Sequence, residues 1–168
     1  RLQEEWLRRL GPPVGRREPP VGWCSWYQYG TRVRQEDFEE NLREAVQQAA
    51  GWSFFQLDDR YATEVGDWLS LRPSFSRGLG SLARQVQEAG LQPGLWFAPF
   101  LASRAARLFR EHPGWFLHDE QGRPLPAGFN PLWGLDGRIY ALDTTHPKFQ
   151  EQLRRSCGPS STTGASGS

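Results

Sequence analysis

The stretch WSFFQLDD, residues 52–59, decides how this sequence is interpreted, because an apolar run ends there in two adjacent carboxylates. A short apolar run rich in aromatic residues favours a β-strand. Asp58 and Asp59 then lie at the carboxyl end of that strand. Such a pair can form a catalytic dyad, a metal site or a clamp on sugar hydroxyls. It can equally be an ordinary turn or a helix cap, which is the more common role for two adjacent acids.

Two further strands flank this run. VGWCSWYQY (21–29) and PGLWFAPF (93–100) are predicted strands, and apolar residues at helical spacing predict helices over 35–51 and 79–92. Gly51 and Gly90 are the expected C-terminal stops of these helices. The order β-α-β-α-β with near-continuous apolar strands predicts an α/β fold whose parallel strands are buried on both faces. A doubly wound sheet and a (β/α)8 barrel both remain open, and either builds its site at the carboxyl ends of the strands.

The pattern changes outside this region. Residues 1–18 are predicted to form a helical lead-in and a linker rich in Pro, Gly and Arg, and residues 19–155 the α/β domain. Beyond Phe100 that domain contains one short helix, then hairpin-like sequence rich in turns, and a last helix that starts near Pro147. Residues 156–168 are of low complexity and are expected to be a disordered tail.

The composition excludes several classes of function. A formal net charge of +1 indicates neither nucleic-acid nor membrane-surface binding. Cys24 and Cys157 have neither metal-ligand spacing nor a disulfide framework, and the three histidines are scattered, so no metal and no cofactor are predicted. Cys24 is expected to be a small buried apolar residue. The cysteine usage favours a reduced, cytoplasmic location.

Strand geometry argues against a catalytic dyad. Neighbouring strand residues point to opposite faces, whereas the two carboxyl groups of a retaining glycosidase lie about 5–5.5 Å apart across one bond. At a strand end, Asp58 and Asp59 can still reach one rim and accept hydrogen bonds from the hydroxyls of a polyol. Trp26 and Trp96, near the other two strand ends, can pack on the C–H face of a sugar ring, although a single Trp is more often part of a core. The residues alone therefore predict an α/β domain with a possible sugar site.

Six strings occur in order along the chain: PPVGWCSWYQY, FFQLDD, GDWL, AGLQPGLWFAPF, FREHPGWFL and YALDTTHP. Together they resemble the microbial α-galactosidases of glycoside hydrolase family 36 over residues 19–155. The resemblance implies a catalytic (β/α)8 barrel, of which this chain would carry about the first three β/α units. It also implies hydrolysis of terminal α-linked galactose with retention and without a metal. The expected ligand is a galactose-containing oligosaccharide, and full-length relatives are expected to be oligomeric.

The resemblance implies six substrate-binding residues: Trp26, Asp58, Asp59, Trp96, Asp67 and Trp68. The acid pair would hold the 4- and 6-hydroxyls of galactose, and the tryptophans of the first and third strands would approach the sugar. The last two residues would belong to a loop that lines the same pocket. The family usually continues the acid pair with glycine, whereas this chain has Arg60. Glycine readily takes a positive φ close to a ligand, and arginine does so only at a cost.

No catalytic residue is assigned. The resemblance places the nucleophile on a fourth strand and the acid/base after a sixth, and we expect this chain to stop before both. Asp143 is no substitute, because it resembles a position that leads into the third helix. The tail would then be the product of a frameshift or a sequencing error, and the chain alone would be inactive. Two alternatives remain: a galactosyl-transferring relative similar to raffinose synthase, and a non-catalytic remnant with weak or no sugar binding.

Overall fold

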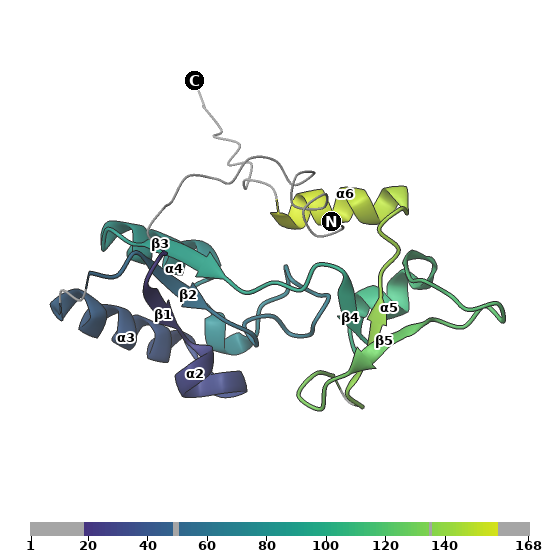
Figure 1. Cartoon of the computed structure of the whole chain (residues 1–168), viewed down its shortest axis with the longest axis horizontal. Coiled ribbons are helices and arrows are strands. Elements are labelled where there is room, and N and C mark those ends of the chain that lie inside the picture. Colours follow the sequence, from purple (N-terminus) through teal and green to yellow (C-terminus); the bar gives the residue numbers. More distant parts are fainter. Residues whose placement is uncertain (1–18, 49–50, 135, 158–168) are drawn as a thin grey trace, which may run out of the picture.

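The computed structural model describes residues 19–48, 51–134 and 136–157, which form two three-stranded sheets. The two sheets lie at opposite ends of the molecule (Figure 1). The parallel sheet has the order β1 (Gly22–Cys24), β2 (Phe54–Leu57) and β3 (Gln92–Leu95). The antiparallel sheet has the order β4 (Leu101–Ser103), β6 (Arg138–Ala141) and β5 (Pro126–Phe129). The predicted α/β class and the β-α-β-α-β order of the first part are confirmed.

Helices connect and cover these strands. In the first part they are α2 (Trp26–Tyr29), α3 (Gln35–Gln47) and α4 (Leu79–Glu88), with 3₁₀ turns η1 (Gly30–Arg32) and η2 (Pro73–Phe75). In the second part they are α5 (Arg107–Glu111), η3 (Pro113–Trp115) and α6 (Pro147–Cys157). None of the helices in these described ranges has both the length and the apolar character needed to cross a membrane.

Strand β2 alternates between two environments. Phe55 and Leu57 are buried and belong to one core with Phe38 and Leu42 of α3 and with residues of α4 such as Val86. Phe54 and Gln56, which alternate with them along β2, are partly buried and point to the opposite face of the sheet, as the period of two in a strand requires. Among the described residues, only the face covered by the helices carries a continuous core, so the prediction of strands buried on both faces is wrong for this part of the chain. β3 is largely exposed, with 47% of the Leu95 surface accessible.

Two predicted strands are shorter than their apolar runs. The first ends at Cys24, because Ser25 takes a helical backbone conformation and Trp26–Tyr29 continue as α2. The third ends at Leu95, which pairs with Leu57, the last residue of β2. A parallel strand stops where its partner turns away, whatever the β-propensity of the residues that follow. The predicted helix over 79–92 ends at Glu88, and Gly90 follows it with a φ of 77°.

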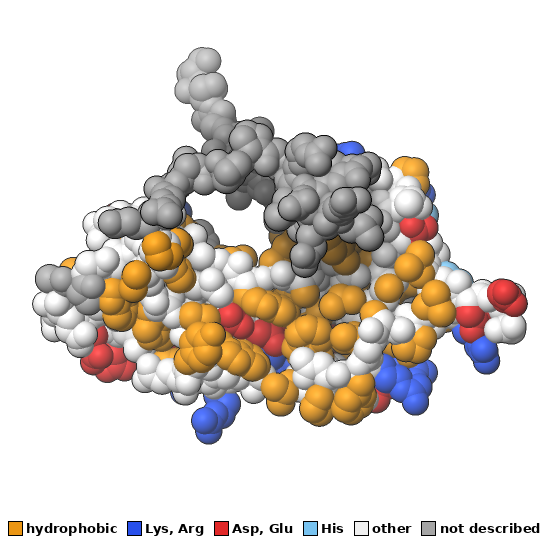
Figure 2. All heavy atoms as spheres, viewed as in Figure 1, with side chains coloured by type: hydrophobic (Ala, Val, Ile, Leu, Met, Phe, Trp, Pro, Cys, Tyr) orange, Lys and Arg blue, Asp and Glu red, His pale blue; other side chains and the backbone are white. Residues whose placement is uncertain are grey.

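The antiparallel sheet has its own small core. Phe116, Tyr140 and Phe149 are buried there, and the rings of Phe109 and Tyr140 lie 4.7 Å apart. This part corresponds to the sequence predicted as hairpin-like, which forms two antiparallel pairings around β6. Figure 2 shows hydrophobic side chains spread over both parts on one face, with acidic side chains gathered between them.

Candidate functional site

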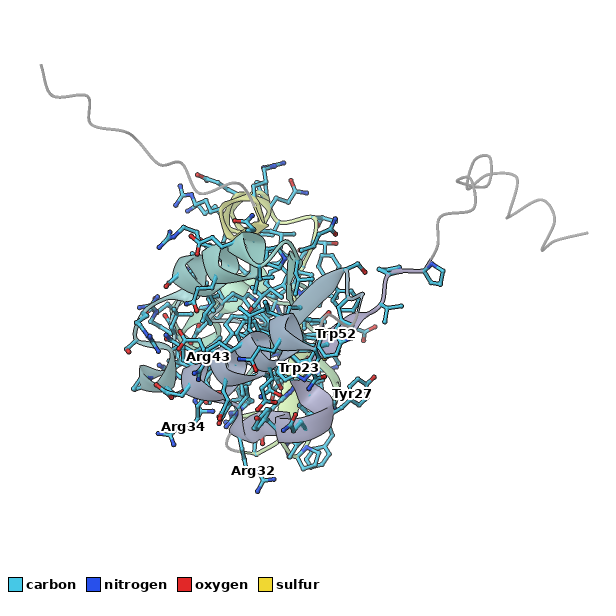
Figure 3. The ribbon with its side chains drawn as sticks, turned by 90° about the vertical axis from the view of Figure 1, so that its left-hand side faces the viewer. Trp23, Tyr27, Arg32, Arg34, Arg43 and Trp52 are labelled. Atoms are coloured by element: carbon cyan, nitrogen blue, oxygen red, sulfur yellow. The ribbon has the colours of Figure 1, made fainter. Side chains whose placement is uncertain are left out.

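A cavity of about 480 Å³ opens at the carboxyl ends of the parallel strands. Its lining comes from β1 and α2, from β2 and the residues that follow it, from the segment after β3, and from the turn between β5 and β6. The lining residues are Cys24, Trp26, Tyr27, Phe54, Gln56, Asp58, Asp59, Trp96, Asn130 and Trp133. Tyr27 lies at the outer margin on α2, where 91% of its surface is exposed (Figure 3). Both sheets therefore contribute to one site.

The structure brings together four of the six residues that the sequence predicts for substrate binding. Trp26, Asp58, Asp59 and Trp96 all line this cavity. β2 ends at Leu57, so the alternation of a strand does not apply to the two acids that follow. Asp58 is half-buried and Asp59 is only 5% exposed. Both carboxylates thus face the same cavity, and Asp59 lies deeper in the protein than Asp58.

Asp58 is anchored to both β1 and β2. Its Oδ2 accepts hydrogen bonds from Nε2 of Gln56 at 3.0 Å and from the Cys24 thiol at 3.3 Å. Its Oδ1 accepts the backbone N–H of Asp59 at 2.8 Å. Its own backbone N–H donates to the hydroxyl of Ser25 at 2.9 Å. A carboxylate has about four acceptor positions, so these three donors leave Asp58 about one for a ligand.

Asp59 is held by one donor on each oxygen. Oδ1 accepts the backbone N–H of Arg60 at 2.6 Å, and Oδ2 accepts the indole N–H of Trp133 at 2.7 Å. Burial raises the pKa of Asp59 above its ordinary value, although the bonds from Trp133 and Arg60 and the charge of Arg60 oppose this rise and the nearby Asp58 adds to it. About two acceptor positions of Asp59 remain open to a ligand.

Arg60 occupies the position where the resembling family has glycine. Its φ is 82°, and among the described residues it is the only one other than glycine with a positive φ. This conformation is costly for arginine, and the loop takes it nevertheless. Nη1 of Arg60 donates to the carbonyl oxygen of Leu132 at 3.2 Å, while its buried Nε has no partner among the described residues. The positive φ of Arg60 therefore stores backbone strain beside the cavity.

Asp67 and Trp68 do not line this cavity. They line a smaller one of about 160 Å³ that also involves α5 and α6. The Asp67 carboxylate accepts the backbone N–H groups of Arg107 and Leu108 at 2.7 and 3.0 Å, so it caps the start of α5. Trp68 packs edge-on against Trp96, with ring centroids 5.7 Å apart. The structure thus gives Asp67 a capping role and places Trp68 behind a cavity residue.

Gln56, Asn130 and Trp133 line the cavity although the sequence did not predict them, and the environment of Cys24 differs from its prediction. Cys24 was predicted to be a small buried apolar residue, whereas it is half-buried and lines the cavity with its thiol against Asp58. Burial raises the pKa of this thiol, and although a backbone hydrogen bond from Trp26 opposes the shift, the bond to Asp58 and its charge add to it. One weak feature of the sequence could have indicated Trp133: it is a large aromatic residue within a turn rich in Pro and Gly.

The arrangement suits a neutral ligand with several hydroxyl groups. Of the described residues that line the cavity, two are carboxylates and none is a cation. The described residues include no group of three His, Cys, Asp or Glu side chains that could hold a metal ion. Hydroxyl donors can bond to the open positions of the acid pair, and the indoles offer apolar faces to a ring. A phosphate would instead need a cationic or N–H-rich cradle.

Comparison with known proteins identifies the relatives. α-Galactosidase AgaA of Geobacillus stearothermophilus is 44% identical over 82 residues, which are 49% of this chain and 11% of that protein. α-Galactosidase Mel36A of Lactobacillus acidophilus is 35% identical over 98 residues, which are 53% of this chain and 13% of that protein. This chain therefore spans only a small part of the length of these relatives.

Solved structures give the same result. TtGalA, an α-galactosidase from Thermus thermophilus in complex with p-nitrophenyl α-D-galactopyranoside, is 38% identical and superposes with a TM-score of 0.76 over 88% of this chain and 29% of that chain. The GH36 α-galactosidase AgaB from Geobacillus stearothermophilus is 27% identical, with a TM-score of 0.68 over 84% and 19%. The family model Melibiase matches residues 36–132, more than half of the sequence. The chain belongs to the Melibiase family.

Proposed function

We propose that the cavity at the ends of β1, β2 and β3 is the galactose-binding part of an α-galactosidase active site. The observation that carries this proposal is the convergence of two carboxylates and two indoles, Asp58, Asp59, Trp26 and Trp96, on one cavity. Relatives with the same local fold have been solved with p-nitrophenyl α-galactoside, stachyose and raffinose. The parallel sheet would then belong to a (β/α)8 barrel.

The acid pair would bind the sugar and not cleave it. Hydrolysis with retention requires an acid and a nucleophile on two sides of one bond, about 5–5.5 Å apart. The two carboxyl groups among the described lining residues are adjacent in the chain and are held by five donors from the protein. Their open acceptor positions fit neighbouring sugar hydroxyls, for which we propose the galactose 4- and 6-hydroxyls. Asp67 and Trp68 would support this site from outside it.

Two further features remain proposals. A cytoplasmic location is expected from the cysteine usage, and an oligomeric state is expected for longer relatives. The ligand class is a neutral, galactose-containing oligosaccharide, because two carboxylates without a lining cation disfavour uronic acids.

Calorimetric titration of the purified chain with galactose and with glucose tests the binding role. The two sugars differ at the C4 hydroxyl, so we expect saturable galactose binding with a Kd on the order of millimolar, about −4 kcal/mol, and glucose binding at least tenfold weaker. Asp58→Asn should weaken galactose binding by about tenfold or more, because hydrogen bonds to charged groups contribute roughly 1.5–3 kcal/mol.

Asp143→Asn is the matched control. Asp143 bonds to Thr145 and lies outside the cavity, so its variant should bind galactose as the wild type does. Equal binding of the two sugars, unaffected by Asp58→Asn, would contradict the proposal. The chain should also release no p-nitrophenol from the aryl α-galactoside, since no described carboxylate faces the pair across the cavity. Measurable turnover would show that the pair or an unidentified group performs chemistry.

A further inference from the structure

The turn between β5 and β6 reaches across to the acid pair. Trp133, in this turn, donates its indole N–H to Oδ2 of Asp59 at 2.7 Å, although 74 residues separate the two in sequence. Trp133 also lines the cavity together with Asn130. The antiparallel sheet therefore supplies one of the two donors that fix the buried carboxylate, and the parallel sheet with its loop supplies the other.

The protein holds Trp133 in place independently of Asp59. Its backbone N–H donates to the carbonyl of Asn130 at 3.0 Å, and the Asn130 side chain accepts the N–H of Leu132 at 3.0 Å. The guanidinium of Arg60, the residue after Asp59, donates to the carbonyl of Leu132 at 3.2 Å. The Trp133 ring lies 5.6 Å from that of Trp96 at an angle of 56°. A donor fixed in this way imposes its geometry on its acceptor.

We propose that Trp133 is a positioning residue for Asp59: the indole N–H of Trp133 orients the buried carboxylate so that its open acceptor positions face the ligand. The consequence for sugar binding rests on the proposed galactose site. The consequence for Asp59 itself does not, because it follows from the contact between the two side chains.

The electrostatic surroundings of Asp59 support this role. The charged groups that face it are Asp58 and Arg60, its neighbours in the chain, while the turn contributes the neutral indole. Burial raises the pKa of Asp59, and the bond from Trp133 is the largest of the influences that lower it. Burial and the charge of Asp58 both raise this pKa. Without the indole N–H, which lowers it, the pKa of Asp59 would rise further.

Carbon-13 NMR titration of the Asp carboxyl groups tests the contact without any ligand. We expect Asp59 to titrate at higher pH in Trp133→Phe than in the wild type. Trp115→Phe is the matched control, because Trp115 stacks on His112 in the second part of the chain, outside the cavity. An unchanged Asp59 midpoint in a folded Trp133→Phe chain would overturn the proposal. If that variant does not fold, the wild-type indole N–H resonance of Trp133 must still shift with the Asp59 midpoint, and its failure to do so would overturn the proposal equally.

Calorimetry with galactose adds the functional outcome. Trp133→Phe should bind about tenfold more weakly at neutral pH, with the acid limb of its binding profile moved to higher pH, while Trp115→Phe binds as the wild type. Equal binding by Trp133→Phe and the wild type at every pH would overturn the positioning role. If no chain binds galactose but the Asp59 midpoint shifts as expected, the proposed function fails and the role of Trp133 stands.

Discussion

Oδ1 of Asp58 accepts the backbone N–H of Asp59 at 2.8 Å, so the first acid of the pair helps to fix the second. This is possible because β2 ends at Leu57 and the chain turns immediately after it. Within a strand the two side chains would point to opposite faces, whereas here both line one cavity. The turn thus brings the carboxylate oxygens of two adjacent acids together as hydrogen-bond acceptors in one cavity. Burying the charge of Asp59 there lowers the stability of the fold.

Asp59→Asn should remove the pH dependence of stability that Asp59 causes. The pKa of Asp59 is raised from 3.8, mainly by burial, so the folded state binds this proton more tightly than the unfolded state. Stability from this group therefore falls as pH rises from about 3.8 through the raised pKa, and it stays lower above that pKa. Asn does not titrate, and it accepts only one of the two N–H groups that bond to Asp59, so the Tm of the variant minus that of the wild type should be larger at pH 7 than at pH 3.5.

Differential scanning calorimetry at pH 7 and at pH 3.5 checks this prediction. As the pH rises from 3.5 to 7, the wild type should lose stability that Asp59→Asn keeps, so the Tm of the variant relative to that of the wild type should rise. A difference in Tm that stays constant or falls over this range would contradict the prediction. Galactose binding by the same variant should fall by about tenfold or more.

Arg60 allows the strain beside the site to be measured. Glycine adopts a φ near 82° without the Cβ clash, so Arg60→Gly should be about 1 kcal/mol more stable than Arg60→Ala. Both variants lose the bond from the guanidinium to Leu132, so their difference isolates the backbone strain. Urea unfolding of the two variants gives this difference directly. Equal stabilities would mean that the loop relaxes and that the backbone at this position stores no strain.

The sequence predicted the part of the site that depends on local signals. Apolar runs located β1, β2 and β3 along the chain, and because the carboxyl ends of parallel strands meet at one edge, Asp58 and Trp96 were expected to lie together. The strand limits were less predictable, because β3 stops where β2 turns away and not where its own apolar run stops. Trp133 could not be predicted, since its place depends on how the second sheet packs across the cavity, and no local pattern encodes that packing.

Asp67→Ala should weaken the fold and leave the site intact. The carboxylate satisfies two N–H groups at the start of α5, and loss of such a cap costs about 1 kcal/mol. We expect a lower Tm and galactose affinity within about twofold of the wild type, because Asp67 lies outside the main cavity. Weaker galactose binding at unchanged Tm would contradict this prediction. It would instead support the substrate-binding role that the family resemblance implies for Asp67.

Cys24 provides a chemical probe of the cavity. The thiolate is the species that reacts with iodoacetamide, and the pKa of this thiol is raised by burial and by Asp58. In a Cys157→Ser background, where Cys24 is the single cysteine, labelling at pH 7.5 should be about tenfold slower than for a free cysteine peptide. Asp58→Asn should accelerate labelling, because it removes the negative charge that disfavours the thiolate.

The labelled chain then tests occupancy of the cavity. The Cys24 thiol lies 3.3 Å from Oδ2 of Asp58, so a carbamidomethyl group on sulfur fills the space where a sugar hydroxyl would bind. We expect galactose binding to be lost after labelling, and saturating galactose to slow the labelling itself. Mass spectrometry follows the modification and calorimetry follows the binding. A fully labelled chain that binds galactose with unchanged affinity would place the sugar away from Asp58, against the proposed site.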